Sequence, residues 1–147
     1  MEQTEWYTHR VQYYETDQMG IVHHSNYIRW FEEARVDWMR RHGIGYREME
    51  ESGIITPVLK VMAEYRSMVH FEDLVEIGVF IKKYNGIVLE LGYEVRDKKT
   101  KQLRTVGESR HCFLNRDGKP LSLKKASPET HAVFSAAAPP TKPKTVQ

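Results

Sequence analysis

The chain has 147 residues, which is the length of one ordinary domain and too short for two independent hydrophobic cores. Its 22 Lys and Arg residues nearly balance its 20 Asp and Glu residues, giving a formal net charge of +2. This balance argues against the basic stripe that nucleic-acid binding requires, so we expect no nucleic-acid partner.

Cysteine content and hydrophobic runs bear on the cellular compartment. The single cysteine, Cys112, excludes a disulfide within the chain and a paired-cysteine metal site. No run of about 18 apolar residues occurs, and the charged first residues, MEQTEWYTHR, lack the apolar segment of a signal peptide. We therefore expect a cytoplasmic protein without a membrane span.

The first predicted elements, in chain order, are a strand and a long helix. Residues 5–14 alternate roughly between aromatic or β-branched and polar side chains, as a half-buried strand does. Ser25 and Asn26 are good helix N-cap residues, apolar residues then recur at helical spacing, and Gly43 suits the position after the last turn. The apolar surface of this helix is broad, which predicts a sheet that curls around it.

A short second helix is predicted at residues 46–51, and most of the chain from there to residue 114 is typical of β-strands. The pattern of apolar residues predicts strands at residues 54–69, 75–81, 87–95 and 103–114. Asn85 and Gly86 lie between the second and third of these strands and form a strong hairpin signal. The order of elements predicts an α+β fold, with one long central helix wrapped by a curved antiparallel sheet of about five strands.

We expect one domain over residues 1–134, which closes with a short helix at residues 128–134. No internal repeat divides the chain. Residues 135–147 are rich in Ala, Pro and Lys without apolar periodicity, which predicts a flexible C-terminal tail.

The stretch YYETDQMGIVHHSNYIRWFEEAR, residues 13–35, places an aspartate, a glycine and two histidines directly before the long helix. Such residues form a loop that leads to a helix cap, a metal site, or a catalytic constellation aimed at the helix N-terminus. His23 and His24 are adjacent, an arrangement that rarely binds one metal, and no third ligand stands at a recognisable spacing. We therefore expect no metal.

The order of elements and this motif together resemble the hotdog fold, and specifically the 4-hydroxybenzoyl-CoA thioesterase and YbgC-like acyl-CoA thioesterase family. The family pattern is an aromatic strand end followed by D-x-x-G-x-V, then N-Y and a helix with an acidic residue and F-x-x-A-R. The positions of this chain that match the pattern are Tyr14, Asp17, Gly20, Val22, Asn26, Tyr27, Phe31, Glu32, Ala34 and Arg35. The resemblance covers the chain except for its tail.

The resemblance implies thioester hydrolysis at sites that lie between two subunits. It implies Asp17 as the essential carboxylate and the backbone N–H near His24 as the oxyanion donor. The substrate-binding residues expected from it are Tyr14, Gly20, Val22, Asn26 and Tyr27. It further implies an acyl-CoA or acyl carrier protein thioester as the partner, no cofactor, and a homodimer or homotetramer.

The chemistry of the reaction explains why such residues would suit it. Thioester hydrolysis needs a nucleophile, or a base that activates water, and a stabiliser of the negative charge on the carbonyl oxygen. Unpaired N–H groups at a helix N-terminus supply that stabiliser, and Gly20 lets the backbone turn so that Asp17 reaches the same carbonyl. Asp17 acts either as nucleophile, giving a mixed anhydride, or as general base on water, and the sequence leaves both routes open.

Two other functions fit the sequence. A hotdog hydratase or dehydratase would use His24 with a carboxylate to move protons next to a thioester, and a non-catalytic module would bind acyl-CoA without turnover. Cys112 has no partner arrangement for a nucleophile, so we expect it to be a packed residue. Basic residues near strand ends are candidates for contacts with the CoA phosphates: Lys82, Lys83, Arg96, Lys98, Lys99, Lys101 and Arg104.

Overall fold

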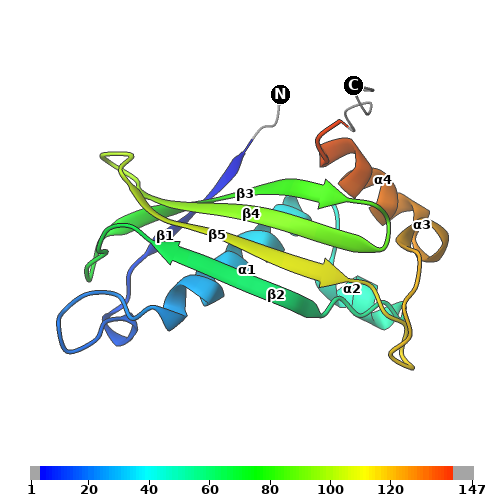
Figure 1. Cartoon of the computed structure of the whole chain (residues 1–147), viewed down its shortest axis with the longest axis horizontal. Coiled ribbons are helices and arrows are strands. Elements are labelled where there is room, and N and C mark those ends of the chain that lie inside the picture. The colour runs from blue at the N-terminus through cyan, green and yellow to red at the C-terminus, as the bar shows by residue number, and fades with distance from the viewer. Residues whose placement is uncertain (1–3, 141–147) are drawn as a thin grey trace, which may run out of the picture.

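A long helix, α1 (Ser25–Arg41), lies across one face of a five-stranded sheet in the computed structural model, which describes residues 4–140 (Figure 1). Neighbouring strands are antiparallel and follow the order β1-β3-β4-β5-β2. The strands are β1 (Glu5–Arg10), β2 (Val58–Tyr65), β3 (Leu74–Tyr84), β4 (Val88–Asp97) and β5 (Leu103–Cys112). The expected α+β architecture, with a central helix against five antiparallel strands, is confirmed.

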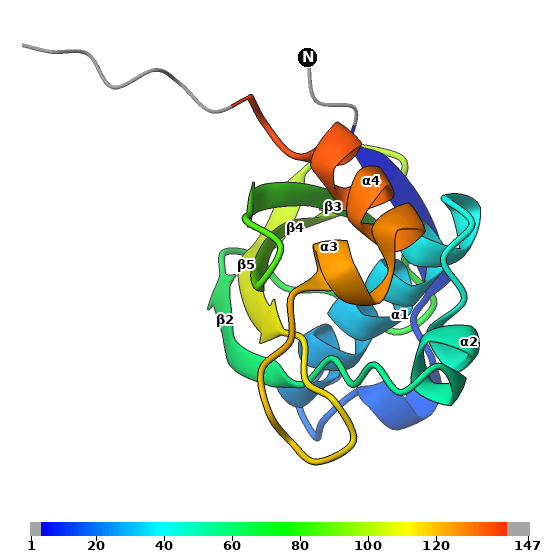
Figure 2. The same ribbon diagram turned by 90° about the vertical axis from the view of Figure 1, so that its right-hand side faces the viewer.

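The sheet curls around α1 (Figure 2), and the shorter helices lie at one end of the molecule (Figure 1). These helices are α2 (Tyr46–Glu51), α3 (Leu123–Ala126) and α4 (Pro128–Ala137). The ring of Phe134 on α4 stacks on that of Trp38 on α1, with 6.0 Å between the ring centroids. Because α4 is fastened to α1 in this way, it forms part of the domain.

Aromatic side chains of α1 explain why the helix lies so close to the sheet. Trp30 and Phe31 are fully buried, and the Phe31 ring stacks on that of Tyr93 on β4 with 4.4 Å between centroids. Gly107 on β5 lies under the same ring, where an added Cβ would come within 2.4 Å of it. Burying each such side chain contributes about 1.5–3 kcal/mol, so this contact helps to fix the helix on the sheet.

The first strand is shorter than predicted, because β1 ends at Arg10 and a 3₁₀ turn follows at Tyr13–Glu15. The Glu15 carboxylate accepts the Gln12 N–H at 2.8 Å, which stabilises this turn. Tyr14, predicted at the strand end, is 77% exposed.

The predicted helix caps are partly wrong. His24 is the N-cap residue of α1, and its side chain makes no capping hydrogen bond. Ser25 and Asn26 belong to the first turn of the helix, because the Asn26 side chain turns inward to bond the preceding loop. Gly43 has a φ of +79°, in agreement with its predicted position after the last turn.

Other predicted elements agree with the structure to different degrees. Helix α2 has the predicted bounds, and the Asn85 side chain closes the β3–β4 hairpin by accepting the N–H groups of Ile87 and Val88. Strand β2 covers only the middle of the predicted 54–69 run. Helix α3 was not predicted, and α4 continues past residue 134 into the predicted tail, of which residues 141–147 lie outside the described residues.

Within residues 4–140, no helix combines the length and apolar character needed to cross a bilayer.

Candidate active site

The segment between β1 and α1 forms a tight turn around Asp17. The Asp17 N–H donates to the Ile21 carbonyl at 2.8 Å, and the Gly20 N–H donates to the Asp17 carbonyl at 3.0 Å. The carboxylate oxygen Oδ1 of Asp17 accepts the Met19 N–H at 2.8 Å. Gly20 has a φ of +79°, a conformation that residues with a side chain rarely adopt, so the glycine permits this turn.

Asp17 lies on the wall of an open hollow of about 380 Å³. Val22, His24 and Tyr27 lie on the same hollow, so the structure brings these predicted site residues together. The facing part of the wall comes from the end of β2 and the segment after it: Tyr65, Arg66, Ser67, Met68 and Val69. A carboxylate, a helix N-terminus and apolar side chains therefore share one concave surface.

Three predicted substrate-binding residues do not line this hollow. Tyr14 is exposed, and Gly20 shapes the turn beside it. Asn26 is buried, and its Nδ2 donates to the Glu15 carbonyl at 2.8 Å and to the His23 carbonyl at 3.3 Å. In this chain Asn26 therefore holds the loop in place, where the sequence predicted contact with the substrate.

The backbone N–H groups around the N-terminus of α1 differ in whether they have an acceptor. The N–H groups of Val22, His23 and Asn26 donate to backbone carbonyls, and that of Ser25 donates to the His23 ring at 3.2 Å. Among the described residues, the His24 N–H has no acceptor. Its carbonyl accepts the Tyr65 hydroxyl at 3.1 Å, which helps to fix the orientation of this peptide.

Buried Glu15 holds the loop against α1. Its carboxylate accepts hydrogen bonds from Trp30 Nε1 at 2.6 Å, His9 Nε2 at 2.8 Å and the Gln12 N–H at 2.8 Å. Its carbonyl accepts the His23 N–H at 2.8 Å. Burial alone would raise the pKa of Glu15, but these hydrogen bonds outweigh it and hold the pKa below its ordinary value, so the carboxylate is charged at neutral pH.

Sequence reasoning missed Glu15, although an acidic residue so close before Asp17 was a visible signal.

Tyr27 supplies a protonated hydroxyl and an aromatic wall. It packs between Trp30 and Tyr65, with ring centroids 4.9 Å and 5.1 Å away. Burial raises the pKa of Tyr27 to about 12. A tyrosine with such a pKa stays neutral at physiological pH and does not serve as a base.

The two histidines before α1 lie against each other. Their rings stack with 4.1 Å between centroids, and His23 Nδ1 lies 2.9 Å from the Ser25 hydroxyl. Within residues 4–140, no group of three or more His, Cys, Asp or Glu side chains is placed to hold a metal ion. Cys112 is half-buried on β5.

Several basic residues proposed for the CoA phosphates already have acidic partners. Lys101 and Arg96 both pair with Glu76 on β3. Lys82 pairs with Glu108. These side chains lie on the sheet and on the hairpin ends, and none of them lines the hollow that contains Asp17.

Comparison with known sequences gives the family of the chain. The model of the thioesterase-like superfamily matches residues 11–145. YneP of Bacillus subtilis (strain 168) is 32% identical over 128 residues, which cover 86% of this chain and 92% of that protein. Acyl-CoA thioester hydrolase YbgC of Escherichia coli O157:H7 is 30% identical over 80 residues, which cover 54% of this chain and 60% of that protein.

Solved structures have the same fold. The crystal structure of DHNA-CoA thioesterase from Staphylococcus aureus matches with a TM-score of 0.86 at 30% identity, over 90% of this chain and 89% of that one. The expected hotdog fold is thereby confirmed. With a family model that spans nearly its whole length, the chain belongs to the thioesterase-like superfamily, whose members similar to it include acyl-CoA thioester hydrolases.

Proposed function

We propose that the chain hydrolyses acyl-CoA thioesters in the hollow between Asp17 and the N-terminus of α1. The observation that carries the proposal is that the Asp17 carboxylate lies on the same hollow as His24, whose backbone N–H is free. The activities of its relatives support it, because one is an acyl-CoA thioester hydrolase and another a DHNA-CoA thioesterase.

The thioester carbonyl would bind at the helix N-terminus. There its oxygen accepts the His24 N–H, and the positive end of the helix dipole favours the negative charge that develops during attack. Losing one such donor typically costs about a hundredfold to a thousandfold in rate. The donor belongs to the backbone, so a change of the His24 side chain alone would leave it in place.

Asp17 would deliver the oxygen nucleophile to the carbonyl carbon. As a general base it takes a proton from water, the water oxygen bonds to the acyl carbon, the C–S bond breaks, and CoA leaves as a thiolate. As a nucleophile its own oxygen forms a mixed anhydride, which water then hydrolyses. If water attacks the Asp17 carbonyl carbon of that anhydride, a single turnover in ¹⁸O-water leaves label in Asp17, which the general-base route never does.

A second copy of the chain would complete the site. Within residues 4–140, strand β2 lies at an edge of the sheet beside β5, and apolar side chains along it are exposed. These are Val58, Leu59, Val61, Met62 and Tyr65. Pairing of β2 with its copy would cover them and close the open side of the hollow, so we propose a homodimer, alone or within a homotetramer.

The experiment that tests the proposed activity measures free-thiol release from short-chain, long-chain and aromatic acyl-CoAs. Asp17→Asn keeps the shape of the side chain and removes its charge, and it should lower the rate by about a hundredfold or more. Asp117→Asn, in an exposed turn far along the chain, is the matched control and should leave the rate unchanged. Equal activity of Asp17→Asn and the unaltered chain would refute the assignment.

Binding of acyl-CoA without any thiol release would instead favour the non-catalytic module. A hydratase would reveal itself by adding water to an unsaturated acyl-CoA while the thioester stays intact. Acyl carrier protein thioesters belong in the same panel, because they present the same reacting group on a different carrier.

A further inference from the structure

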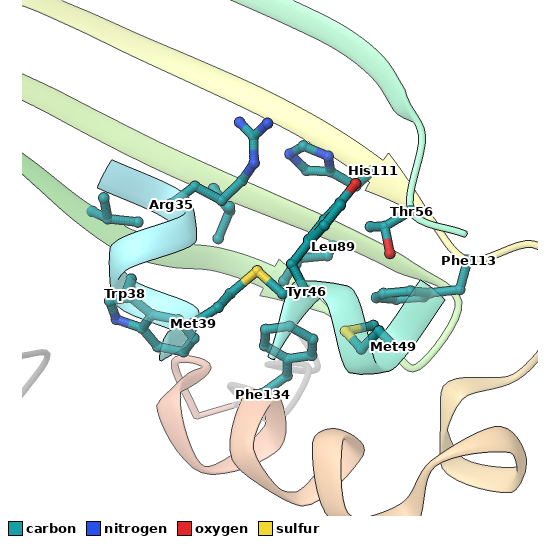
Figure 3. Close-up of a pocket in the computed structure, with 12 residues that line it drawn as sticks. Arg35, Trp38, Met39, Tyr46, Met49, Thr56, Leu89, His111, Phe113 and Phe134 are labelled. Atoms are coloured by element: carbon teal, nitrogen blue, oxygen red, sulfur yellow. The ribbon is translucent and has the colours of Figure 1, made fainter. Parts of the chain in front are cut away.

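A second cavity lies at the other end of α1, between this helix, α2 and the sheet (Figure 3). It is small, with a volume of about 20 Å³. None of its lining residues belongs to the hollow that contains Asp17. Its apolar wall includes Trp38, Met39, Met49, Phe113 and Phe134.

Four polar side chains reach this cavity from different parts of the fold. In Figure 3 Arg35 comes from α1, Tyr46 from α2, His111 from β5 and Thr56 from the segment before β2. His111 is 1% exposed. No Asp, Glu, Asn or Gln side chain is among the described residues that line the cavity.

A chain of hydrogen bonds runs from Arg35 to His111 behind the cavity wall. Arg35 Nη1 donates to the Tyr93 hydroxyl at 3.2 Å. The Tyr93 hydroxyl lies 2.6 Å from the Ser109 hydroxyl, which lies 2.7 Å from His111 Nε2. Three of these four residues come from the neighbouring strands β4 and β5, so the sheet holds this series of hydrogen bonds in place.

The donor and acceptor roles in this series of hydrogen bonds are assigned from Arg35 onward. A guanidinium group only donates, so the Tyr93 oxygen accepts from Arg35 and its own O–H is free to donate to Ser109. In the arrangement that bonds every hydroxyl proton, Ser109 in turn donates to His111 Nε2. A neutral imidazole that accepts at Nε2 carries its proton on Nδ1, so His111 presents an N–H donor at its other ring nitrogen.

The charge state of His111 agrees with this direction. Burial and the positive charge of Arg35 lower the pKa of His111 to about 4, so the ring is neutral at physiological pH. Among the described residues, no partner is found for Nδ1, and Arg35 forms no ion pair. The cavity therefore offers a cation and a buried N–H donor, with hydroxyl groups from Tyr46 and Thr56.

We propose that this cavity binds the carboxylate group of a small organic acid. The carboxylate would accept from the Arg35 guanidinium and from His111 Nδ1–H, and the Thr56 hydroxyl would donate a further hydrogen bond. A negative charge is what the wall lacks, because no Asp or Glu side chain lines it, and Arg is the side chain best suited to bind a carboxylate. This inference goes beyond the proposed thioesterase activity and does not depend on it.

The size of the cavity decides which acids serve as probes. About 20 Å³ holds a group the size of one or two water molecules, which suits a carboxylate head with a very short body. Formate and acetate therefore fit first. Longer apolar acids need room that Met39 and Met49 can provide, because methionine side chains are unbranched and adapt readily.

The test is NMR titration of the full chain with sodium acetate, with sodium chloride as the ionic-strength control. The ¹⁵N shifts of His111 should show a Nδ1–H tautomer, and acetate should move that proton downfield in a saturable way. Arg35→Gln should weaken acetate binding about tenfold or more, while Arg40→Gln, an exposed cation on the same helix, should leave it unchanged. Thr56→Val keeps the shape of a half-buried side chain and should weaken binding several-fold even if Arg35→Gln folds poorly.

Three results would overturn the proposal: a Nε2–H tautomer of His111, acetate shifts no larger than those of chloride, or equal affinity in the Arg35, Thr56 and Arg40 variants. A crystal grown in acetate that contains only an ordered water in the cavity would do the same. Asp17→Asn should retain acetate binding in full, so failure of this site and failure of the thioesterase proposal are separate outcomes.

Discussion

The indole Nε1 of Trp30 donates a 2.6 Å hydrogen bond to the buried carboxylate of Glu15. Trp30 is fully buried in the middle of the α1 interface, whereas Glu15 stands shortly before Asp17 in the chain. The bond therefore ties the loop that carries the proposed catalytic carboxylate to the most rigid part of the domain. Several measurable effects follow from this and from related contacts.

Replacing Glu15 by Gln should weaken both the fold and the catalytic turn. The amide keeps the size of the side chain but its NH₂ group cannot accept from Trp30, His9 and Gln12 together, so about 1–3 kcal/mol of the free energy of unfolding should be lost. Urea unfolding measures this loss. Glu50→Gln, at an exposed position of α2, is the matched control and should stay within about 0.5 kcal/mol of the unaltered chain.

The loss of stability at acid pH should depend on Glu15. Its pKa in the folded chain is below the ordinary value of 4.5, so the unfolded chain binds the proton more tightly. Its contribution is then fully present above about pH 4.5 and is lost as the pH falls through the folded pKa. Urea midpoints between pH 5 and 3 should fall less steeply in Glu15→Gln. An unchanged slope would contradict the role given to this carboxylate.

His111 should make the folded chain less stable as the pH falls below neutrality. Its pKa is about 4 in the folded chain and near 6.5 when unfolded, so the unfolded chain takes up the proton first. Stability from this group is complete above about pH 6.5 and declines towards pH 4, by roughly 3 kcal/mol in all. His111→Gln should flatten the decline, whereas exposed His70→Gln should not. The free energy of unfolding measured at intervals of pH tests this directly.

Two glycines allow the stability cost of a left-handed backbone conformation to be measured separately from the effect of displacing Asp17. Gly20 and Gly118 have φ values of +79° and +77°, and no atom would obstruct an added Cβ at either one. Alanine at either position should therefore cost about 1–2 kcal/mol of stability from the left-handed conformation alone. Only Gly20→Ala should also lower the rate of thiol release, because only it displaces Asp17. Equal rates in the two variants would show that this turn does not set the position of Asp17.

The features that the sequence predicted are those encoded by local patterns. The long helix, the second helix and the Asn85-Gly86 hairpin each depend on residues close together in the chain, and all three are present. Of the site residues expected from the motif, Asp17, Val22, His24 and Tyr27 share the hollow, whereas Tyr14, Gly20 and Asn26 do not line it.

What the sequence did not reveal depends on side chains that meet only in the folded chain. The carboxylate of Glu15 is bonded by His9 from one strand and by Trp30 from a helix. The chain from Arg35 to His111 likewise joins three elements. Neither set of hydrogen bonds produces a recognisable pattern in the sequence, because each depends on how the strands and the helix pack.

The contact between Phe31 and Gly107 determines where α1 can settle. The residues of β5 that face the helix are Thr105, Gly107, Ser109 and His111, and only one of them lacks a side chain. A helix displaced by one turn, about 5.4 Å, would drive the ring against a hydroxyl or an imidazole. The absent side chain at Gly107 therefore favours the observed alignment of α1 with the sheet over one displaced by a turn.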